Sequence, residues 1–243
     1  QQGRWGYCFC SISPELYISI AGLQRIGAIP VLLDSWVRNE QLTEVLQNSQ
    51  PSGIIAPSAW LKAFGNNLDI FGIQVRVSTD DYAAGKGVIQ LSNLLKGKAQ
   101  KIVPVEQNDT ALITYTTGSS GSPKGANRTH RFLAAQHYAL KRLFPYKTND
   151  IDLPVFPVFA LNNIASGITT VIPAIDISKP DLKDSKTLIS QIKKYKVNYM
   201  TLAPSSFRNL AIYCDAESIS LDGISRVLTG GAPISETDIL RFI

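Results

Sequence analysis

Short apolar runs alternate with segments of helical spacing along most of the chain, and this alternation restricts the fold to a narrow class. After the run "YCFCSI", Ser13 can cap a helix and Pro14 suits its first position, and apolar residues then recur at helical spacing until Gly27. Further strand patterns occur at "AIPVLL", "GIIA" and "IQVRV". Such alternation is typical of parallel sheets covered by helices. We therefore expect an α/β fold.

A polar stretch divides this alternation in two. Residues 79 to about 105, which include "TDDYAAGKG", indicate a linker or a peripheral excursion. The alternation then resumes, with strands expected at "ALITYT", "IDLPVFPV", "TTVIPAI", "VNYMTL" and "SRVLTGG" and helices over 131–144, 188–195 and about 207–213. We expect two parallel-sheet α/β subdomains, residues 1–105 and residues 106–243.

Composition limits the functional classes. The chain has 24 Lys and Arg against 19 Asp and Glu, a net charge of +5, but no dense basic run, so nucleic acid is not an expected partner. No apolar run is long enough to span a bilayer, and no signal segment opens the chain. The three cysteines lack the spacing of a zinc site or a disulfide framework. These features favour a cytoplasmic protein with reduced thiols.

The two ends indicate a piece of a longer protein. The only methionine is Met200, and the chain opens at Gln1 shortly before an expected strand. At the other end Ser235 can cap a helix, with Asp238 three residues on, and the chain stops about two turns later.

The stretch "YTTGSSGSPKG", residues 115–125, has the composition of a phosphate-binding loop. Glycines allow the backbone N–H groups to approach an anion closely, hydroxyl groups add donors, and a lysine adds charge. From Thr110 through Asn149 the sequence contains no Asp or Glu, so nothing there repels an anion. A flexible surface loop is the alternative. The loop is not that of P-loop NTPases, because Pro123 precedes Lys124 and Gly125 follows it.

The stretch resembles the signature "YTSGTTGxPKG" of adenylate-forming enzymes, from which it differs by exchanges between serine and threonine. The resemblance implies the large N-terminal domain of such an enzyme, without its C-terminal domain, and ATP with Mg2+ as cofactors. It implies catalytic roles for Lys124 and Thr116 in stabilising charge on the phosphates. The implied cofactor-binding residues of the loop are Thr117, Gly118, Ser119, Ser120 and Gly121. The family's magnesium-binding glutamate, ribose-binding aspartate and adenylation lysine fall outside residues 1–243, so no metal ligand is expected here.

Two further segments carry the resemblance. "LTGGAPIS" is similar to the family's adenine-binding turn, which implies that role for Gly230, Gly231, Ala232 and Pro233. A plain strand-to-helix turn before the cap Ser235 is the structural alternative. The opening "SPELYISIAGLQRIGAIPVLLD" resembles the family's first helix and strand, so the likeness covers essentially the whole chain.

The segment "DLPVFPVFALNN", residues 152–163, stands where the family lines its acid pocket. The candidate pocket residues are Phe156, Pro157, Phe159 and Leu161. An apolar lining without fixed charge fits an aliphatic acid. The alternative is a strand end that is apolar because it is buried. Pro157 stands where many coenzyme A ligases would have a histidine, so that role cannot be carried over. The run "FPVFALNN…TTVIPAID" also resembles the β-lactone synthetases of bacterial olefin biosynthesis.

These resemblances imply activation of an aliphatic, fatty carboxylic acid as an acyl-adenylate, followed by transfer to a thiol such as coenzyme A. Two alternatives stay open: a β-lactone synthetase acting on a β-hydroxy fatty acid, and a non-catalytic nucleotide-binding protein with this fold. We expect little or no turnover from these 243 residues alone. The expected partners are a small carboxylic acid and a nucleotide.

Overall fold

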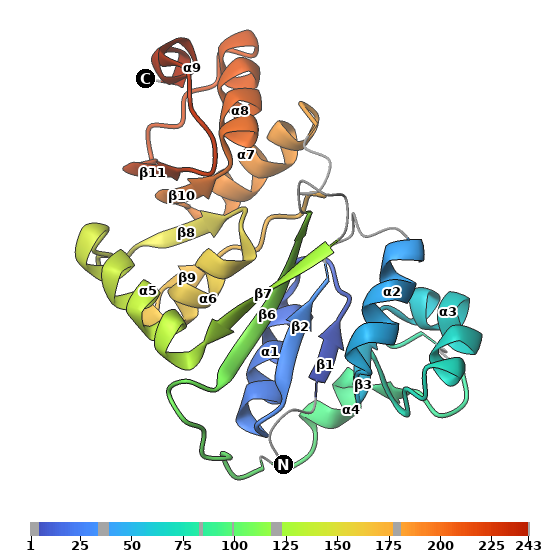
Figure 1. Cartoon of the computed structure of the whole chain (residues 1–243). Coiled ribbons are helices and arrows are strands. Elements are labelled where there is room, and N and C mark those ends of the chain that lie inside the picture. The colour runs from blue at the N-terminus through green and yellow to red at the C-terminus, as the bar shows by residue number, and fades with distance from the viewer. Residues whose placement is uncertain are drawn as a thin grey trace. The chain divides into compact units, whose positions relative to one another are not determined.

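The computed structural model describes residues 5–33, 39–82, 85–98, 100–117, 123–176 and 181–242. The chain forms two compact units, Gln1–Gln136 and His137–Ile243 (Figure 1). Each unit is built on its own sheet, and each is described by itself below.

The sheet of the first unit has, among the described residues, seven strands in the order β5-β4-β3-β1-β2-β6-β7. The strands are β1 (Trp5–Cys8), β2 (Ile29–Leu32), β3 (Gly53–Ala56), β4 (Val75–Ser78), β5 (Ile89–Gln90), β6 (Thr110–Thr117) and β7 (Pro123–Thr129). All neighbours pair in parallel except β6 and β7, which are antiparallel. The helices are α1 (Pro14–Arg25), α2 (Asn39–Ser49), α3 (Ser58–Ile70), α4 (Leu91–Leu95) and α5 (His130–Leu143), which contains the boundary with the second unit.

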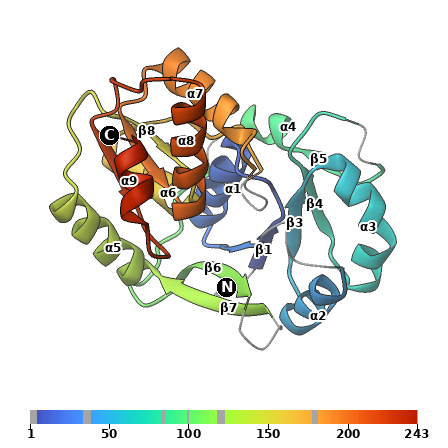
Figure 2. The same cartoon turned by 90° about the horizontal axis from the view of Figure 1, so that it is seen from above.

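Apolar side chains on both faces of the central strands explain why this sheet is covered on both sides. Tyr7, Val31 and Ile54, from three adjacent strands, are fully buried in one core cluster with residues of α2 and α3. Figure 2 shows α1 on one face of the sheet and α2 and α3 on the other, as right-handed crossovers require when β2 and β3 lie on opposite sides of β1. Ser13 caps α1 as expected, since its Oγ accepts from the Leu16 N–H at 3.4 Å.

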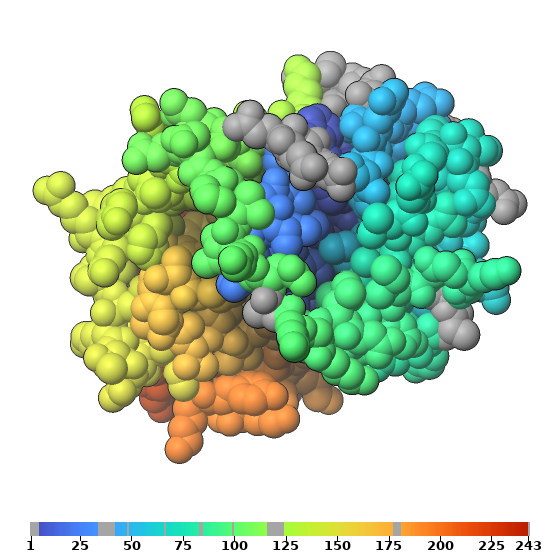
Figure 3. Space-filling model, turned by 90° about the horizontal axis from the view of Figure 1, so that it is seen from below, coloured from blue at the N-terminus to red at the C-terminus, as the bar shows by residue number. Residues whose placement is uncertain are grey.

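The connection from α4 to β6 lies on the surface of the first unit (Figure 3, green). It follows the end of α1, because Val103 N–H donates to Arg25 O at 2.9 Å and Arg25 Nε donates to Gln100 O at 2.7 Å. β6 then returns to the sheet beside β2, so the structure divides into units after residue 136, later than the boundary near 105 that the sequence suggested.

The second unit has a parallel sheet with the order β11-β10-β8-β9 among its described residues. Its strands are β8 (Ile151–Pro154), β9 (Thr169–Thr170), β10 (Tyr199–Leu202) and β11 (Arg226–Thr229), and its helices are α6 (Pro157–Ser166), α7 (Asp184–Tyr195), α8 (Pro204–Ala216) and α9 (Glu236–Phe242). Leu153 and Met200 of the central strands are fully buried against apolar side chains of α7 and α8.

The expected α/β fold with parallel sheets is confirmed, but the structure differs from the expected strands in three places. β7 was not foreseen, and the strand expected over "TTVIPAI" covers only Thr169–Thr170. The strand expected over "IDLPVFPV" ends at Pro154, after which α6 begins at Pro157. Pro157 has no N–H for a sheet and its fixed φ suits the first position of a helix. No helix in the described part of the chain is long and apolar enough to cross a membrane.

Candidate functional site

The glycine- and serine-rich stretch joins two strands that pair with each other. In the antiparallel register of β6 and β7, Lys124 lies opposite Thr116 and Pro123 opposite Thr117. Directly opposed residues of such a pair have Cα atoms about 4.5–5.5 Å apart, so the two predicted catalytic residues are brought together at the base of the loop. Gly118, Ser119, Ser120 and Gly121 lie outside the described residues, and their phosphate-binding role stays a prediction.

The residues that flank the loop explain why a hairpin forms here. Ala111, Leu112 and Ile113 of β6 are buried and anchor that strand in the sheet. On β7, a Cβ added at Gly125 would lie 3.3 Å from both Ile113 Cγ2 and Tyr115 Cζ. The glycine therefore lets β7 pack closely against β6, which fixes the position of Lys124 next to it.

Positive charge is available on β7. The Lys124 side chain is exposed, and no carboxylate in the described part of the chain pairs with it. Arg128 is more constrained, because its Nε donates to Thr114 Oγ1 at 3.3 Å and its guanidinium lies 5.3 Å from the centre of the Phe132 ring. Of the two cations of β7, Lys124 is therefore the one whose side chain can bind an anion.

In the second unit, the predicted adenine-binding turn follows β11. Gly231 has φ of +93°, a conformation that strains any residue with a Cβ. The Oγ1 of Thr229, the last residue of β11, is buried and has no hydrogen-bond partner among the described residues. Ser235 caps α9, since its Oγ accepts from the Asp238 N–H at 3.1 Å. The strand-to-helix turn is therefore confirmed, and adenine binding by Gly230 to Pro233 stays a prediction.

The predicted acid-pocket residues lie at the start of α6 rather than on a strand. Phe156 is the extended residue before the helix, Pro157 is its first residue, and Phe159 and Leu161 follow within it. All four are half-buried, and the rings of Phe156 and Phe159 are 6.0 Å apart. The strand-end interpretation of this segment was wrong, while its pocket role stays a prediction.

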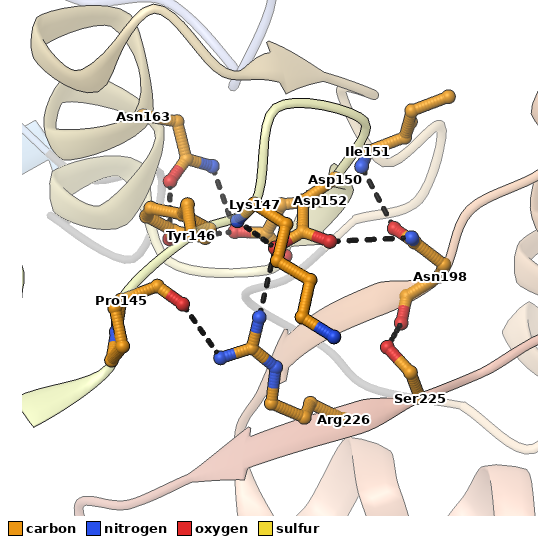
Figure 4. Close-up of polar contacts among 10 residues, drawn as sticks. All are labelled: Pro145, Tyr146, Lys147, Asp150, Ile151, Asp152, Asn163, Asn198, Ser225 and Arg226. Atoms are coloured by element: carbon orange, nitrogen blue, oxygen red, sulfur yellow. Dashed lines mark hydrogen bonds and ion pairs between the residues drawn. The ribbon is translucent and has the colours of Figure 1, made fainter.

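The sequence did not reveal a buried polar cluster between β8 and α6 (Figure 4). Asp152 is fully buried, and its Oδ2 accepts from Asn163 Nδ2 at 2.7 Å and lies 3.4 Å from the hydroxyl groups of Tyr146 and Thr201. Tyr146 also donates to Asn163 Oδ1 at 2.5 Å. Burial raises the pKa of the Asp152 carboxyl group to about 7, although these hydrogen bonds oppose the shift. The one sign of this cluster in the sequence is an aspartate inside the apolar run "IDLPV".

A second polar cluster connects the amino-terminal ends of β8 and β11 (Figure 4). Arg226 Nη2 donates to Asp150 Oδ2 and its Nη1 to Pro145 O, both at 2.8 Å, while its guanidinium lies 5.0 Å from the centre of the Tyr199 ring. Ligands of parallel sheets bind beyond the carboxyl ends of the strands. We therefore infer that this second cluster stabilises the unit.

Within the described ranges, no group of three or more His, Cys, Asp or Glu side chains could hold a metal ion. Lysine, hydroxyl and backbone N–H groups are hydrogen-bond donors that suit phosphate oxygens, so the residue types of the loop fit a nucleotide phosphate better than a metal ion.

Comparison with known proteins identifies the relatives of this chain. The family profile described as AMP-binding enzyme matches residues 8–243. The olefin β-lactone synthetase of Stenotrophomonas maltophilia is 31% identical over 226 residues, covering 91% of this chain and 40% of that protein. The 4-coumarate–CoA ligase 3 of Arabidopsis thaliana is 26% identical over 243 residues, covering 92% and 41%. The chain thus spans about two fifths of the length of these curated relatives.

Solved structures agree in fold. A long-chain-fatty-acid–CoA ligase from Archaeoglobus fulgidus matches with a TM-score of 0.82 and 21% identity, covering 99% of this chain and 48% of that chain. The o-succinylbenzoate coenzyme A synthetase of Bacillus subtilis, in complex with ATP and magnesium ion, matches with a TM-score of 0.75 and 16% identity, covering 99% and 47%.

Proposed function

Because the chain belongs to the family of AMP-binding enzymes, we propose that it is part of a ligase that activates an aliphatic carboxylic acid with ATP. A carboxylate oxygen attacks the α-phosphorus of ATP, the bond to pyrophosphate breaks, and an acyl-adenylate forms. A thiol such as that of coenzyme A then attacks the acyl carbon and releases AMP. The observation that carries the proposal is the register of the β6–β7 hairpin, which sets Lys124 opposite Thr116 at the base of the loop.

The residues of this chain would act mainly by binding and orientation. Lys124, with donors from Thr116 through Gly121, would hold the β- and γ-phosphates and stabilise the charge that develops on leaving pyrophosphate. The turn from Gly230 to Pro233 would pack against the adenine. Mg2+, when bound, supplies charge neutralisation between the phosphates.

The acid would meet the half-buried apolar residues at the start of α6. None of Phe156, Pro157, Phe159 and Leu161 carries a charge that could pair with an amino group, which favours a fatty acid over an amino acid.

A β-lactone synthetase is the second candidate, and the first two curated relatives favour it, at 31% and 29% identity. In that case the acceptor would be the β-hydroxyl group of the activated acid itself, and no thiol would be needed. Assays of the full-length protein with fatty acids and with β-hydroxy fatty acids, with and without coenzyme A, separate the two by product: an acyl-thioester or a β-lactone.

The nucleotide site is tested by calorimetric titration of ATP with Mg2+ into this chain, with AMP as a parallel ligand. A charged hydrogen bond is worth roughly 1.5–3 kcal/mol, so Lys124→Ala should weaken ATP binding by about tenfold or more and AMP binding much less. Lys141→Ala, which removes an exposed lysine of α5, is the matched control and should bind as the parent does.

Pyrophosphate exchange by the full-length protein, lost in its Lys124→Ala variant, would support the ligase. Nucleotide binding by the full-length protein without exchange for any carboxylic acid would indicate a non-catalytic binding protein. Equal weakening of ATP and AMP by Lys124→Ala would contradict the phosphate role.

A further inference from the structure

The helix α6 buries polar rather than large apolar side chains. Its buried residues are Ala160, Asn162 and Asn163, whereas its large apolar side chains are half-buried or exposed. A buried amide group is costly unless it is hydrogen-bonded, and hydrogen bonds are directional where apolar contacts are not. The position of α6 in this unit therefore depends on the groups that bind these two amides.

The side-chain amide of Asn163 is bonded at both of its ends (Figure 4). Its Nδ2 donates to Asp152 Oδ2 at 2.7 Å, and its Oδ1 accepts from the Tyr146 hydroxyl group at 2.5 Å. Because the donors of an amide are on its nitrogen and the acceptor is its oxygen, these two partners fit only one orientation of the group. Asn162 binds elsewhere, since its Oδ1 lies 3.0 Å from His137 Nδ1 of α5. Asn163 is thus the side chain that connects α6 to β8.

Asp152 is the acceptor in this network. Its Oδ2 accepts from Asn163 and lies 3.4 Å from the hydroxyl groups of Tyr146 and Thr201. All three neighbours can donate, which is the arrangement that suits an ionised carboxylate. Asp152 belongs to β8 and Thr201 to the adjacent strand β10, so the acceptor is fixed by the sheet. Asp152 and Asn163 are both fully buried, and water does not compete for their bond.

The helix itself carries the effect of this bond to the candidate acid site. Phe159 precedes Asn163 by four residues, so the two side chains lie on one face of α6, one turn apart. The helix begins at Pro157, three residues after β8 ends at Pro154, and ligands of parallel sheets bind beyond the carboxyl ends of the strands. A shift or rotation of α6 at Asn163 would therefore move Phe159.

We propose that Asn163 is a positioning residue for the acid site: its amide group, held between Asp152 and Tyr146, fixes α6 against β8 and thereby sets the place of Phe159. The inference rests on the proposed function in one respect, namely that the start of α6 lines the acid pocket. It adds that a buried amide, which does not touch the acid, determines how well the acid binds.

The first test removes a single hydrogen bond. Tyr146→Phe keeps the ring, which packs edge-on against Tyr199, and deletes the hydroxyl group that donates to Asn163 Oδ1. In the full-length protein KM for the acid should rise by about tenfold, because a binding group misplaced by about 1 Å can cost up to about a hundredfold. KM for ATP should stay near the value of the parent, since the proposed nucleotide residues lie on other elements.

The second test reverses the pair. Asn163→Asp sets a second carboxylate against Asp152 and should raise KM for the acid further than Tyr146→Phe does. Adding Asp152→Asn restores one amide and one carboxylate, with the donor now on β8, and should return KM for the acid most of the way to that of the parent. The assays are run at about pH 8, because burial raises the pKa of Asp152 to about 7 and its carboxyl group is mostly ionised there. Tyr146→Phe alone decides the matter if Asn163→Asp does not fold.

Asp150→Asn is the matched control, because Asp150 is also buried in the second unit but pairs with Arg226. It should lower the free energy of unfolding and leave KM for the acid unchanged. Hydrogen exchange of the α6 amides in this chain, without substrate, measures the hold on the helix directly. Exchange should be faster in Tyr146→Phe and in Asn163→Asp, and it should slow again when Asp152→Asn is added.

The outcomes separate the positioning role from the ligase function. Faster exchange of α6 with an unchanged KM for the acid would refute the positioning role and leave the ligase function standing. Equal rises in KM for the acid and for ATP, or no recovery in the reversed pair, would also refute it. Absence of adenylation by the parent with every carboxylic acid tested would refute the proposed function itself, and with it the role of Asn163 in acid binding, whatever the exchange data show.

Discussion

The ion pair between Arg226 and Asp150 offers a quantitative test of what stabilises the second unit. Asp150 is 4% exposed, and its Oδ2 receives Arg226 Nη2 at 2.8 Å and the Lys147 N–H at 2.7 Å. Arg226→Met keeps most of the apolar stem of the side chain, which lies near the Tyr199 ring, but removes the guanidinium group. The variant leaves a buried carboxylate without its cation and the Pro145 carbonyl oxygen without its donor.

Removing one partner of a buried ion pair costs about 3–5 kcal/mol, and exposed pairs contribute about 0–1 kcal/mol. The Asp150 side chain is 3% exposed but that of Arg226 is 34% exposed, so water can partly replace the lost cation. We therefore expect Arg226→Met to lower the free energy of unfolding by about 2–4 kcal/mol, near the middle of these limits.

A double-mutant cycle in urea, with Asp150→Asn and the combined variant, isolates the pair. Once the carboxylate is replaced by an amide, loss of the arginine no longer leaves an unpaired buried charge. The double variant should therefore lose less free energy of unfolding than the two single variants lose in sum. The coupling energy should be about 1–3 kcal/mol, as for residues in direct contact. Additive losses, with a coupling energy near zero, would refute the reasoning, because they would mean that Arg226 stabilises the unit only through its stem and its bond to Pro145.

Two backbone predictions and one packing prediction can be checked by the same unfolding assay. Gly231→Ala should destabilise by about 1–2 kcal/mol because of its left-handed conformation, whereas Gly230→Ala, which has open space around its Cα, should be nearly neutral. Ser13→Ala should lose about 1 kcal/mol of helix capping and Ser13→Gly only a few tenths; equal losses would contradict the cap. Met200→Ala should cost about 2–5 kcal/mol, because Met200 is fully buried, and a loss below 1 kcal/mol would show that the core refills the cavity.

The strand and helix alternation was predictable from the sequence because burial on both faces makes the central strands continuously apolar. "GIIA" forms β3, and the "YMTL" part of "VNYMTL", all four residues of which are buried, forms β10. Local capping was predictable as well, since Ser13 and Ser235 lie within a few residues of the N–H groups that they accept from.

Other features were decided by contacts between distant residues. β7 has the sequence "PKGANRT", which carries no strand pattern, and it is a strand because β6 pairs with it. The apolar run "PVFPVF" continues past the end of β8 into α6, and composition alone does not mark where the strand stops. Asp152 bonds to Asn163 and lies near Thr201, which are 11 and 49 residues away, so no local period could reveal the cluster.

The second unit places its two polar clusters at different levels of the same strands, and this difference bears on function. The Asp150–Arg226 pair joins the amino-terminal ends of β8 and β11. Asp152 lies one pleat further along β8, toward the carboxyl ends, and reaches α6 instead of a cation. Arg226 pairs with Asp150, whereas no Lys or Arg in the described part of the chain pairs with Asp152, and burial raises the pKa of its carboxyl group to about 7. The two aspartates therefore contribute to the unit in different ways: Asp150 through an ion pair with β11, and Asp152 through a hydrogen bond with Asn163 of α6.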